Sequence, residues 1–342
     1  MAQPSYEYAL GRISVLSTHL LTAAQLRRIA EADSTKAAMK LLLETGYGEN
    51  TATEQEMAQG EIDLIIRAQM QLTRKRIQEL TPDPELTGLF LLPVDTHNLK
   101  CLLKARLLGT QADAILREGG NFDLNLLKDM VQTKYYEDLP PIYCQTLNEI
   151  EGDLAREADP FRLSALLDGA MFRQAKAVLD RKKEDGFIRK YFSLWADYLN
   201  TISLIRAQNL HWELSQLRLV LVDCGEIPRT VFEESLDVPP EQLGARLNQG
   251  SHGAELVQAI NEFAQTNELG VIARRMEEGL SLILRRARWD THSLGPIVGY
   301  LEARETEAEA LRMIFGAIQG GFEPQLPPML PDHRKHGRQQ DG

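Results

Sequence analysis

The sequence contains few of the residues from which small metal, redox and membrane sites are usually built. Its 342 residues include three cysteines, Cys101, Cys144 and Cys224, which form no Cys-x-x-Cys pair. A zinc or redox motif is therefore excluded, and Cys101, within an apolar run, is expected to be a buried reduced thiol. The longest apolar stretches, LFLLPV (89–94) and LRLVLV (217–222), are far too short to cross a bilayer.

Several catalytic motifs are also absent. There is no GxxxxGK[ST] phosphate loop, no HExxH, no Glu-x-x-His and no Asp-Asp-x-x-Asp. These absences argue against P-loop nucleotide hydrolysis, zinc peptidase and di-iron chemistry, and against a helical prenyl-diphosphate enzyme. We expect no catalytic residue, no metal site and no cofactor.

The charge balance narrows the range of partners. The chain has 38 basic and 49 acidic residues, a net charge of −11, and no basic stripe. Binding to nucleic acid or to an anionic lipid surface needs clustered Lys and Arg, so neither is expected. The N-terminus lacks the basic start and apolar core of a signal peptide. The sequence predicts a cytoplasmic protein that meets a membrane through another protein.

Aromatic residues make up only 6% of the chain. The apolar residues recur mostly with helical periodicity. Segments 54–80, 160–183 and 269–288 each place apolar residues three to four positions apart, which is typical of amphipathic helices. No strand-type alternation of any length occurs. The pattern predicts an all-α fold.

A short phrase recurs along the chain after each of these long helices. Asp95 is followed three residues later by Asn98, and Asp197 by Asn200, 102 residues further on. A third version lies a further 110 residues along, where Glu307 takes the place of the aspartate and Ala310 that of the asparagine. Repetition at a period near 100 residues indicates three related domains rather than a solenoid.

The segments that follow each phrase repeat as well. Segment 119–150 opens on Gly119 and segment 224–250 on Cys224-Gly225, and both are interrupted by Pro-Pro, whereas the third phrase is followed only by a proline-rich tail. The downstream half that the third repeat lacks resembles the pair of short amphipathic segments in 17–48. We therefore predict repeat units at 53–153, at 156–262 and at 265–322 together with 5–50, and a disordered tail at 324–342.

Asp95 and Asp197 allow two interpretations. Two carboxylates could divide acid and base roles in catalysis, or each could accept backbone hydrogen bonds near a helix start. Catalysis needs residues that converge, whereas these two occupy equivalent places in different units, so the structural role is favoured. His97 is expected to make a local hydrogen bond and His252 to be a loop residue.

The acidic run 302–312 also allows two interpretations, a metal site or a solvated helix face with Arg304 and Arg312 as intrahelical partners. The solvated face is favoured. The predicted site is accordingly a set of structural polar ties within the repeats. Its members are Asp95, Asn98, Asp197, Asn200, Glu307 and Arg312.

These residues carry a resemblance to a known family. The phrase DTHNLK at 95–100, the second Asp-x-x-Asn at 197–200 and PIVGYLEARETEAEALRMIFGA at 296–317 are similar to motifs of the C subunit of the V/A-type ATPase/ATP synthase. That family is related to the d subunit of vacuolar ATPases. The resemblance covers nearly the whole chain. One departure is Ala310, where the family usually has Asn, so one polar tie is expected to be weaker.

The resemblance implies a fold and a role. The fold would be three helical units around a pseudo-threefold axis, forming a funnel-shaped body. The role would be that of a non-catalytic rotor component, one copy per complex, coupling the central shaft of the D and F subunits to the membrane proteolipid ring during ATP-linked proton or sodium transport. The alternative is a helical scaffold protein unrelated to ATPases.

Overall fold

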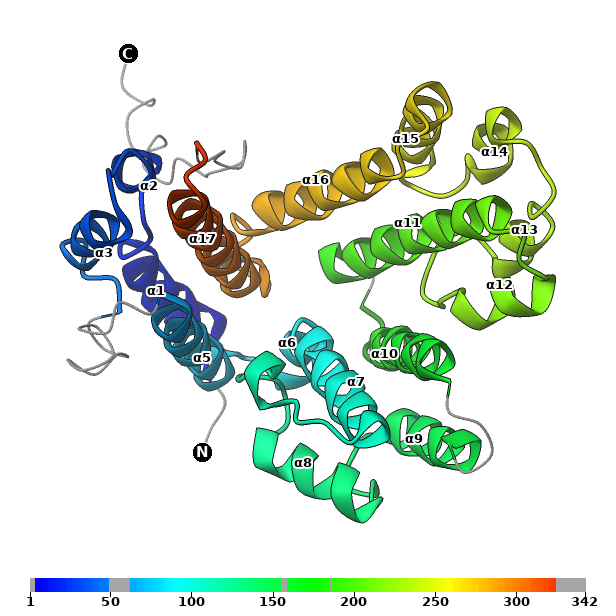
Figure 1. Ribbon diagram of the computed structural model, residues 1–342, viewed down its shortest axis with the longest axis horizontal. Coiled ribbons are helices and arrows are strands. Elements are labelled where there is room, and N and C mark those ends of the chain that lie inside the picture. The colour runs from blue at the N-terminus through cyan, green and yellow to red at the C-terminus, as the bar shows by residue number, and fades with distance from the viewer. Residues whose placement is uncertain (1–3, 49–61, 155–158, 185, 324–342) are drawn as a thin grey trace. The chain divides into compact units, whose positions relative to one another are not determined.

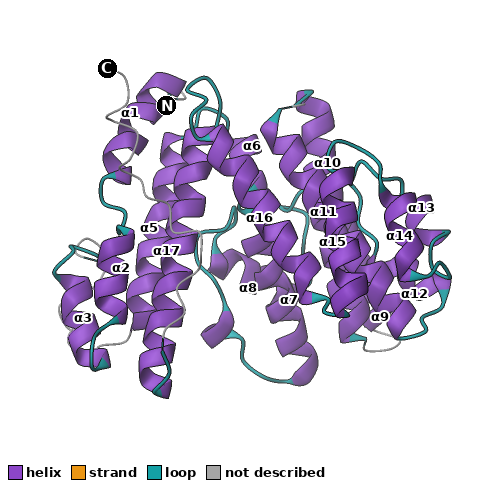
Figure 2. Ribbon diagram, turned by 90° about the horizontal axis from the view of Figure 1, so that it is seen from above, coloured by secondary structure: helices purple, strands orange, loops and turns teal. Residues whose placement is uncertain are grey.

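The computed structural model describes residues 4–48, 62–154, 159–184 and 186–323. Within these ranges the regular structure is helical and contains no strand, as Figure 2 shows. The all-α prediction is confirmed. The helices are α1 (Tyr6–Ser17), α2 (Ala23–Ala30), α3 (Thr35–Leu43), α5 (Ile62–Leu80), α6 (Pro84–Leu89), α7 (Leu92–Leu108), η1 (Asp113–Ile115), α8 (Leu124–Thr133), α9 (Pro141–Leu154), α10 (Pro160–Lys182), α11 (Phe187–Asn209), α12 (Leu214–Val220), α13 (Arg229–Glu233), α14 (Pro240–Leu247), α15 (Gly253–Thr266), α16 (Gly270–Ala287) and α17 (Gly295–Gly320).

Two of the three predicted amphipathic segments match helices of the structure within one residue at each end. The predicted segment 160–183 is α10, in which Asp159 caps the first turn by accepting hydrogen bonds from the backbone N–H of Phe161 (2.8 Å) and Arg162 (3.1 Å). The predicted segment 269–288 is α16. Residues 62–80 of the segment predicted at 54–80 form α5, and residues 54–61 of that segment lie outside the described residues, as does the tail from 324.

One compact unit comprises residues 1–87 and 287–342. In it α17 is the central element, because it packs against α1, α2, α3 and α5 (Figure 1). The buried face of α17 is built from small and apolar side chains, among them Ala303, Leu311 and Phe315. Helices from the N-terminal and C-terminal parts of the chain are therefore packed together in this unit.

A second compact unit comprises residues 88–286. Here α10 packs against α7, α9, α11 and α12, and α14 packs against α15. One core cluster joins the apolar faces of α11 to α16, with Ile205, Phe232 and Ile260 fully buried. Dense packing of this kind gives a stiff helical body. None of the described helices is both long enough and apolar enough to cross a membrane.

Candidate functional site

Asp95 lies in the first turn of α7 and is completely buried. Its carboxylate accepts hydrogen bonds from the backbone N–H of Asn121 (3.0 Å), from the backbone N–H of Phe122 (3.3 Å) and from the Asn121 side-chain amide (2.7 Å). Phe122 directly precedes Asp123, the N-cap of α8. Asp95 thus fixes the loop that leads into the following helix.

Asp197 on α11 repeats this arrangement. It is also completely buried and accepts from the backbone N–H of Glu226 (2.9 Å) and of Ile227 (3.3 Å). Ile227 directly precedes Pro228, the N-cap of α13. A further contact comes from His252, whose Nε2 lies 2.8 Å from the Asp197 carboxylate.

Asn98 and Asn200 make the same pair of hydrogen bonds, each with one loop residue. Asn98 donates to the backbone carbonyl of Arg117 (2.7 Å) and accepts from the backbone N–H of Arg117 (2.9 Å). Asn200 makes the same pair of bonds with Val222, at 2.9 Å and 2.8 Å. Each amide therefore pairs with both backbone groups of one loop residue, as a neighbouring strand would.

Glycine allows the loop to approach each aspartate. A Cβ added to Gly120 would lie 2.0 Å from Oδ1 of Asp95, and a Cβ added to Gly225 would lie 2.0 Å from Oδ1 of Asp197. The residues before these glycines, Gly119 and Cys224, both have φ of +83°. The two loops therefore share a left-handed residue at this position, which is uncommon for a cysteine.

Glu307 on α17 has an equivalent contact in the other unit. It accepts from the backbone N–H of Leu21 (2.6 Å), and Leu21 directly precedes Thr22, the N-cap of α2. The second oxygen of Glu307 binds Arg304 at 2.6 Å, and both side chains are buried. Burial raises the pKa of the Glu307 carboxyl, while the Arg304 guanidinium and the Leu21 N–H oppose that rise.

The solvated-face interpretation of the 302–312 run is therefore wrong for its central pair. Arg304 is the intrahelical partner of Glu307, but both lie in the protein interior. Arg312 does not pair with Glu307. It is half exposed and forms an ion pair with Asp63 on α5 at 3.5 Å. Ala310 is fully buried and offers no polar group in the place of the asparagines.

Two histidines were candidates in the sequence. His97 binds the carbonyl of Ile115, 2.9 Å from its Nε2 and 18 residues along the chain, rather than making the local bond expected at the helix start. His252 is more than a loop residue, because it is buried and bound to Asp197 across 55 residues of sequence. Sequence spacing offered no signal for this contact.

The arrangement suits loop fixation rather than chemistry at a shared centre. Asp95 is attached to residues 121 and 122, Asp197 to residues 226, 227 and 252, and Glu307 to residues 21 and 304. Each carboxylate accepts at least one backbone N–H from a loop, and each also binds one side chain, that of Asn121, His252 and Arg304 respectively. Within the described part of the chain, no group of three or more His, Cys, Asp or Glu side chains could hold a metal ion.

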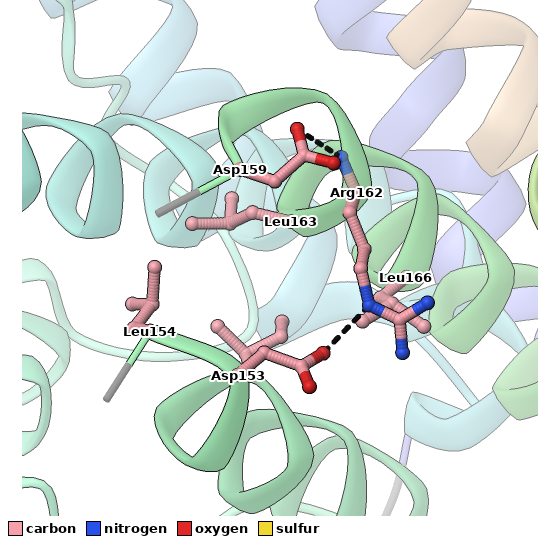
Figure 3. A pocket seen from close by; sticks show the side chains of 7 residues that line it. Asp153, Leu154, Asp159, Arg162, Leu163 and Leu166 are labelled. Carbon is pink, nitrogen blue, oxygen red and sulfur yellow. Dashed lines mark hydrogen bonds and ion pairs between the residues drawn. The ribbon is translucent and has the colours of Figure 1, made fainter. Parts of the chain in front are cut away.

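A small hollow lies between the end of α9 and the start of α10 (Figure 3). It is lined by Ile150, Asp153, Leu154, Asp159, Arg162, Leu163 and Leu166. Its volume of about 10 Å³ holds about one water molecule. Arg162 spans it, donating to Asp153 at 2.7 Å. A hollow of this size offers no room for a substrate.

Comparison with known proteins gives a consistent result. The family described as ATP synthase (C/AC39) subunit matches residues 9–326. The chain is 23% identical over 337 residues to the C subunit of the A-type ATP synthase of Thermococcus kodakarensis, covering 94% of this chain and 88% of the relative. It is 22% identical over 352 residues to the corresponding protein of Methanocaldococcus jannaschii, covering 93% and 83%. The C subunit of the V-type sodium ATPase of Enterococcus hirae is 20% identical over 238 residues, covering 70% and 72%.

Proposed function

Because the chain belongs to the ATP synthase (C/AC39) subunit family, we propose that it is the non-catalytic central-stalk component of a V/A-type rotary ATPase/ATP synthase. In this role it couples the central shaft, made of the D and F subunits, to the membrane proteolipid ring. One copy serves each complex, on the cytoplasmic side of the membrane. The transported ion is a proton or sodium.

The observation that carries the proposal is the extent of the family match. It spans residues 9–326, which include all three acid-bearing helices, α7 with Asp95, α11 with Asp197 and α17 with Glu307. The alternative, a helical scaffold protein unrelated to ATPases, does not fit a chain that belongs to the ATP synthase (C/AC39) subunit family.

The buried polar contacts support a mechanical role. A protein that transmits torque needs stiffness, and densely packed helices have low compressibility. Asp95, Asn98, Asp197, Asn200 and Glu307 serve, in this proposal, as structural ties that fix each loop to its own helix. Arg312 forms an exposed ion pair with Asp63 of α5, and such a pair adds little to the stability of the fold. The division into three repeat units around a pseudo-threefold axis, forming a funnel, remains part of the proposal.

Co-purification tests this function directly. A tagged chain is expected to retain the D–F shaft from one fraction and the detergent-solubilised proteolipid ring from another. The matched control is the chain carrying Gly225→Ala, in which the added methyl group weakens the hydrogen bonds to Asp197. Retention of neither partner by the native chain would contradict the proposal.

A further inference from the structure

The turn between α10 and α11 carries a concentration of positive charge. Residues 176–190 contain six Lys or Arg and three acidic residues, a net charge of +3, within a chain whose net charge is −11. Arg181, Lys182 and Lys183, at the end of α10, and Lys190, in the first turn of α11, are all exposed. The net charge of the whole chain argues against an anionic partner, but it does not describe this surface.

Asp180, the acidic residue in the last turn of α10, is already paired within the turn. Its carboxylate forms ion pairs with Lys176 and, at 3.0 Å, with Arg189 of α11. Lys183 and Lys190 form no ion pair with any residue in the described part of the chain. The charges of these two lysines are therefore presented to the surroundings of the protein.

Lys183 has a backbone conformation that favours glycine. It is the C-cap of α10, and its φ of +53° lies in the left-handed region, where Gly and Asn are the usual residues. Its charge complements the negative end of the helix dipole. Residues held in unfavourable conformations also recur at functional sites, where the side chain itself is needed. Only a functional role predicts that glycine at this position weakens binding to another body.

Half-buried aromatic side chains lie beside the exposed lysines. Phe187 and Tyr191 are one helical turn apart on α11 and share a face with Lys190. The Tyr191 ring packs against the rings of Phe90 and Trp195, with centroids 5.2 Å and 6.1 Å away. Aromatic rings beside lysines are typical of surfaces that meet the interfacial layer of a bilayer, where apolar and charged groups are both accommodated.

The kind of cation indicates the kind of anionic partner. Three of the four exposed cations are lysines, which act as flexible point charges, whereas arginine is better suited to the fixed geometry of a carboxylate. A lipid headgroup layer offers many phosphates in no fixed geometry, so it is recognised by the number of charges. Clusters of about four to eight Lys and Arg are typical of proteins that bind anionic lipid.

We propose that this turn binds the anionic headgroup layer of a lipid bilayer. The contact, which we term the basic surface, consists of Arg181, Lys182, Lys183, Phe187 and Lys190. It goes beyond the proposed function, which requires only protein partners, and it attaches the chain to the membrane surface directly. Because the attraction is electrostatic, the affinity falls as the salt concentration rises.

Vesicle sedimentation with the full chain tests the proposal. The native chain should bind vesicles of phosphatidylcholine with about 30% phosphatidylglycerol at least tenfold more tightly than vesicles of phosphatidylcholine alone. Raising the salt concentration from about 0.05 to about 0.5 M should weaken this binding at least tenfold. Equal affinity for the two kinds of vesicle, or no binding to either, would overturn the proposal.

Two glycine substitutions form a matched pair. Lys134 is the C-cap of α8 with φ of +58°, is 63% exposed and pairs with Glu151 at 3.7 Å, so Lys134→Gly removes the same charge from the same backbone conformation outside the basic surface. Lys183→Gly should bind anionic vesicles about fivefold more weakly than the native chain, with a Tm that is unchanged or higher, and Lys134→Gly should bind normally. A lower Tm with normal vesicle binding for Lys183→Gly would assign Lys183 to the helix end and overturn the proposal.

A double variant separates this proposal from the proposed function. Lys183→Gly/Lys190→Gln should bind anionic vesicles at least tenfold more weakly, yet retain the D–F shaft and the proteolipid ring as well as the native chain does. Normal vesicle binding by the double variant overturns the basic surface alone. Failure of the native chain to retain the shaft and the ring overturns the proposed function and leaves the vesicle result standing, because that measurement uses no other subunit.

Discussion

Glu307 accepts a hydrogen bond from the backbone N–H of Leu21, at 2.6 Å and across 286 residues of sequence. The contact joins α17, near the C-terminus, to the loop that begins α2. Asp95 with Phe122, and Asp197 with Ile227, make the same connection between an acid on a helix and the residue before the next N-cap. Three acids therefore share one structural relationship.

Removal of the Glu307 carboxylate should destabilise the protein strongly. Glu307→Ala leaves Arg304 buried without its carboxylate and Leu21 without its acceptor, and loss of one partner of a buried ion pair costs about 3 kcal/mol or more. Chemical denaturation measures this change. The control is Glu309→Ala, at an exposed position on the same helix, which should alter the free energy of unfolding by less than about 0.5 kcal/mol. Equal effects of the two variants would contradict a structural role for Glu307.

Small additions at the two loop glycines should also be costly. Gly120→Ala and Gly225→Ala place a methyl group 2.0 Å from a buried carboxylate, so the loop must move and its N–H bonds weaken. We expect each to lower the free energy of unfolding by about 2–4 kcal/mol.

The matched control is Gly152→Ala on α9. A Cβ there meets no atom within 4 Å, and Ala is favoured over Gly in a helix. This variant should raise the free energy of unfolding by about 0.5–1 kcal/mol. If all three substitutions change the free energy of unfolding alike, the loops do not approach Asp95 and Asp197 as closely as the structure shows.

The amide tie of α11 predicts a third effect. Asn200→Ala removes the partner of both backbone groups of Val222, which are buried in the fold. An unsatisfied buried polar group costs about 1–3 kcal/mol, so the substitution should lower the free energy of unfolding by about 2–3 kcal/mol. Asn209→Ala, at the exposed end of the same helix, should be nearly neutral in thermal unfolding.

Cys224 should be almost unreactive in the native protein. Burial raises the pKa of its thiol to about 12, so at pH 8 the thiolate fraction is about 10⁻⁴, compared with about a tenth for a thiol with the ordinary pKa near 9. Iodoacetamide should modify Cys224 at least a hundredfold more slowly than the same residue in urea, as followed by peptide mass spectrometry. Because the folded pKa lies above the unfolded value near 9, this burial stabilises the fold below about pH 9, and the contribution is lost as pH rises towards 12. Rapid native labelling at pH 8 would contradict the burial.

The sequence predicted helices well where the apolar periodicity is sustained. The segment 160–183 matched α10 because its apolar residues recur three to four positions apart. In the structure Asp159 caps its first turn and Lys183, in the left-handed conformation, ends it. The recurrence of Asp95 and Asp197 was visible for a similar reason, since both phrases keep their spacing along a helix.

Contacts between distant segments were not visible in the same way. Arg304 and Glu307 have the spacing of a solvated ion pair, and only the packing of α1, α2, α3 and α5 around α17 makes them buried. His252 reaches Asp197 from a loop 55 residues away. The proximity of Gly120 and Gly225 to the aspartates depends on loop paths that no periodicity encodes.

In the proposed function this chain transmits rotation without taking part in ATP chemistry. The most direct test of this role is ATP-driven ion pumping by complexes reconstituted into vesicles with and without the chain. The account predicts that without it ATP hydrolysis by the soluble head continues, that pumping is lost, and that adding the native chain restores pumping. Pumping that persists at the full rate in complexes lacking the chain would contradict the account.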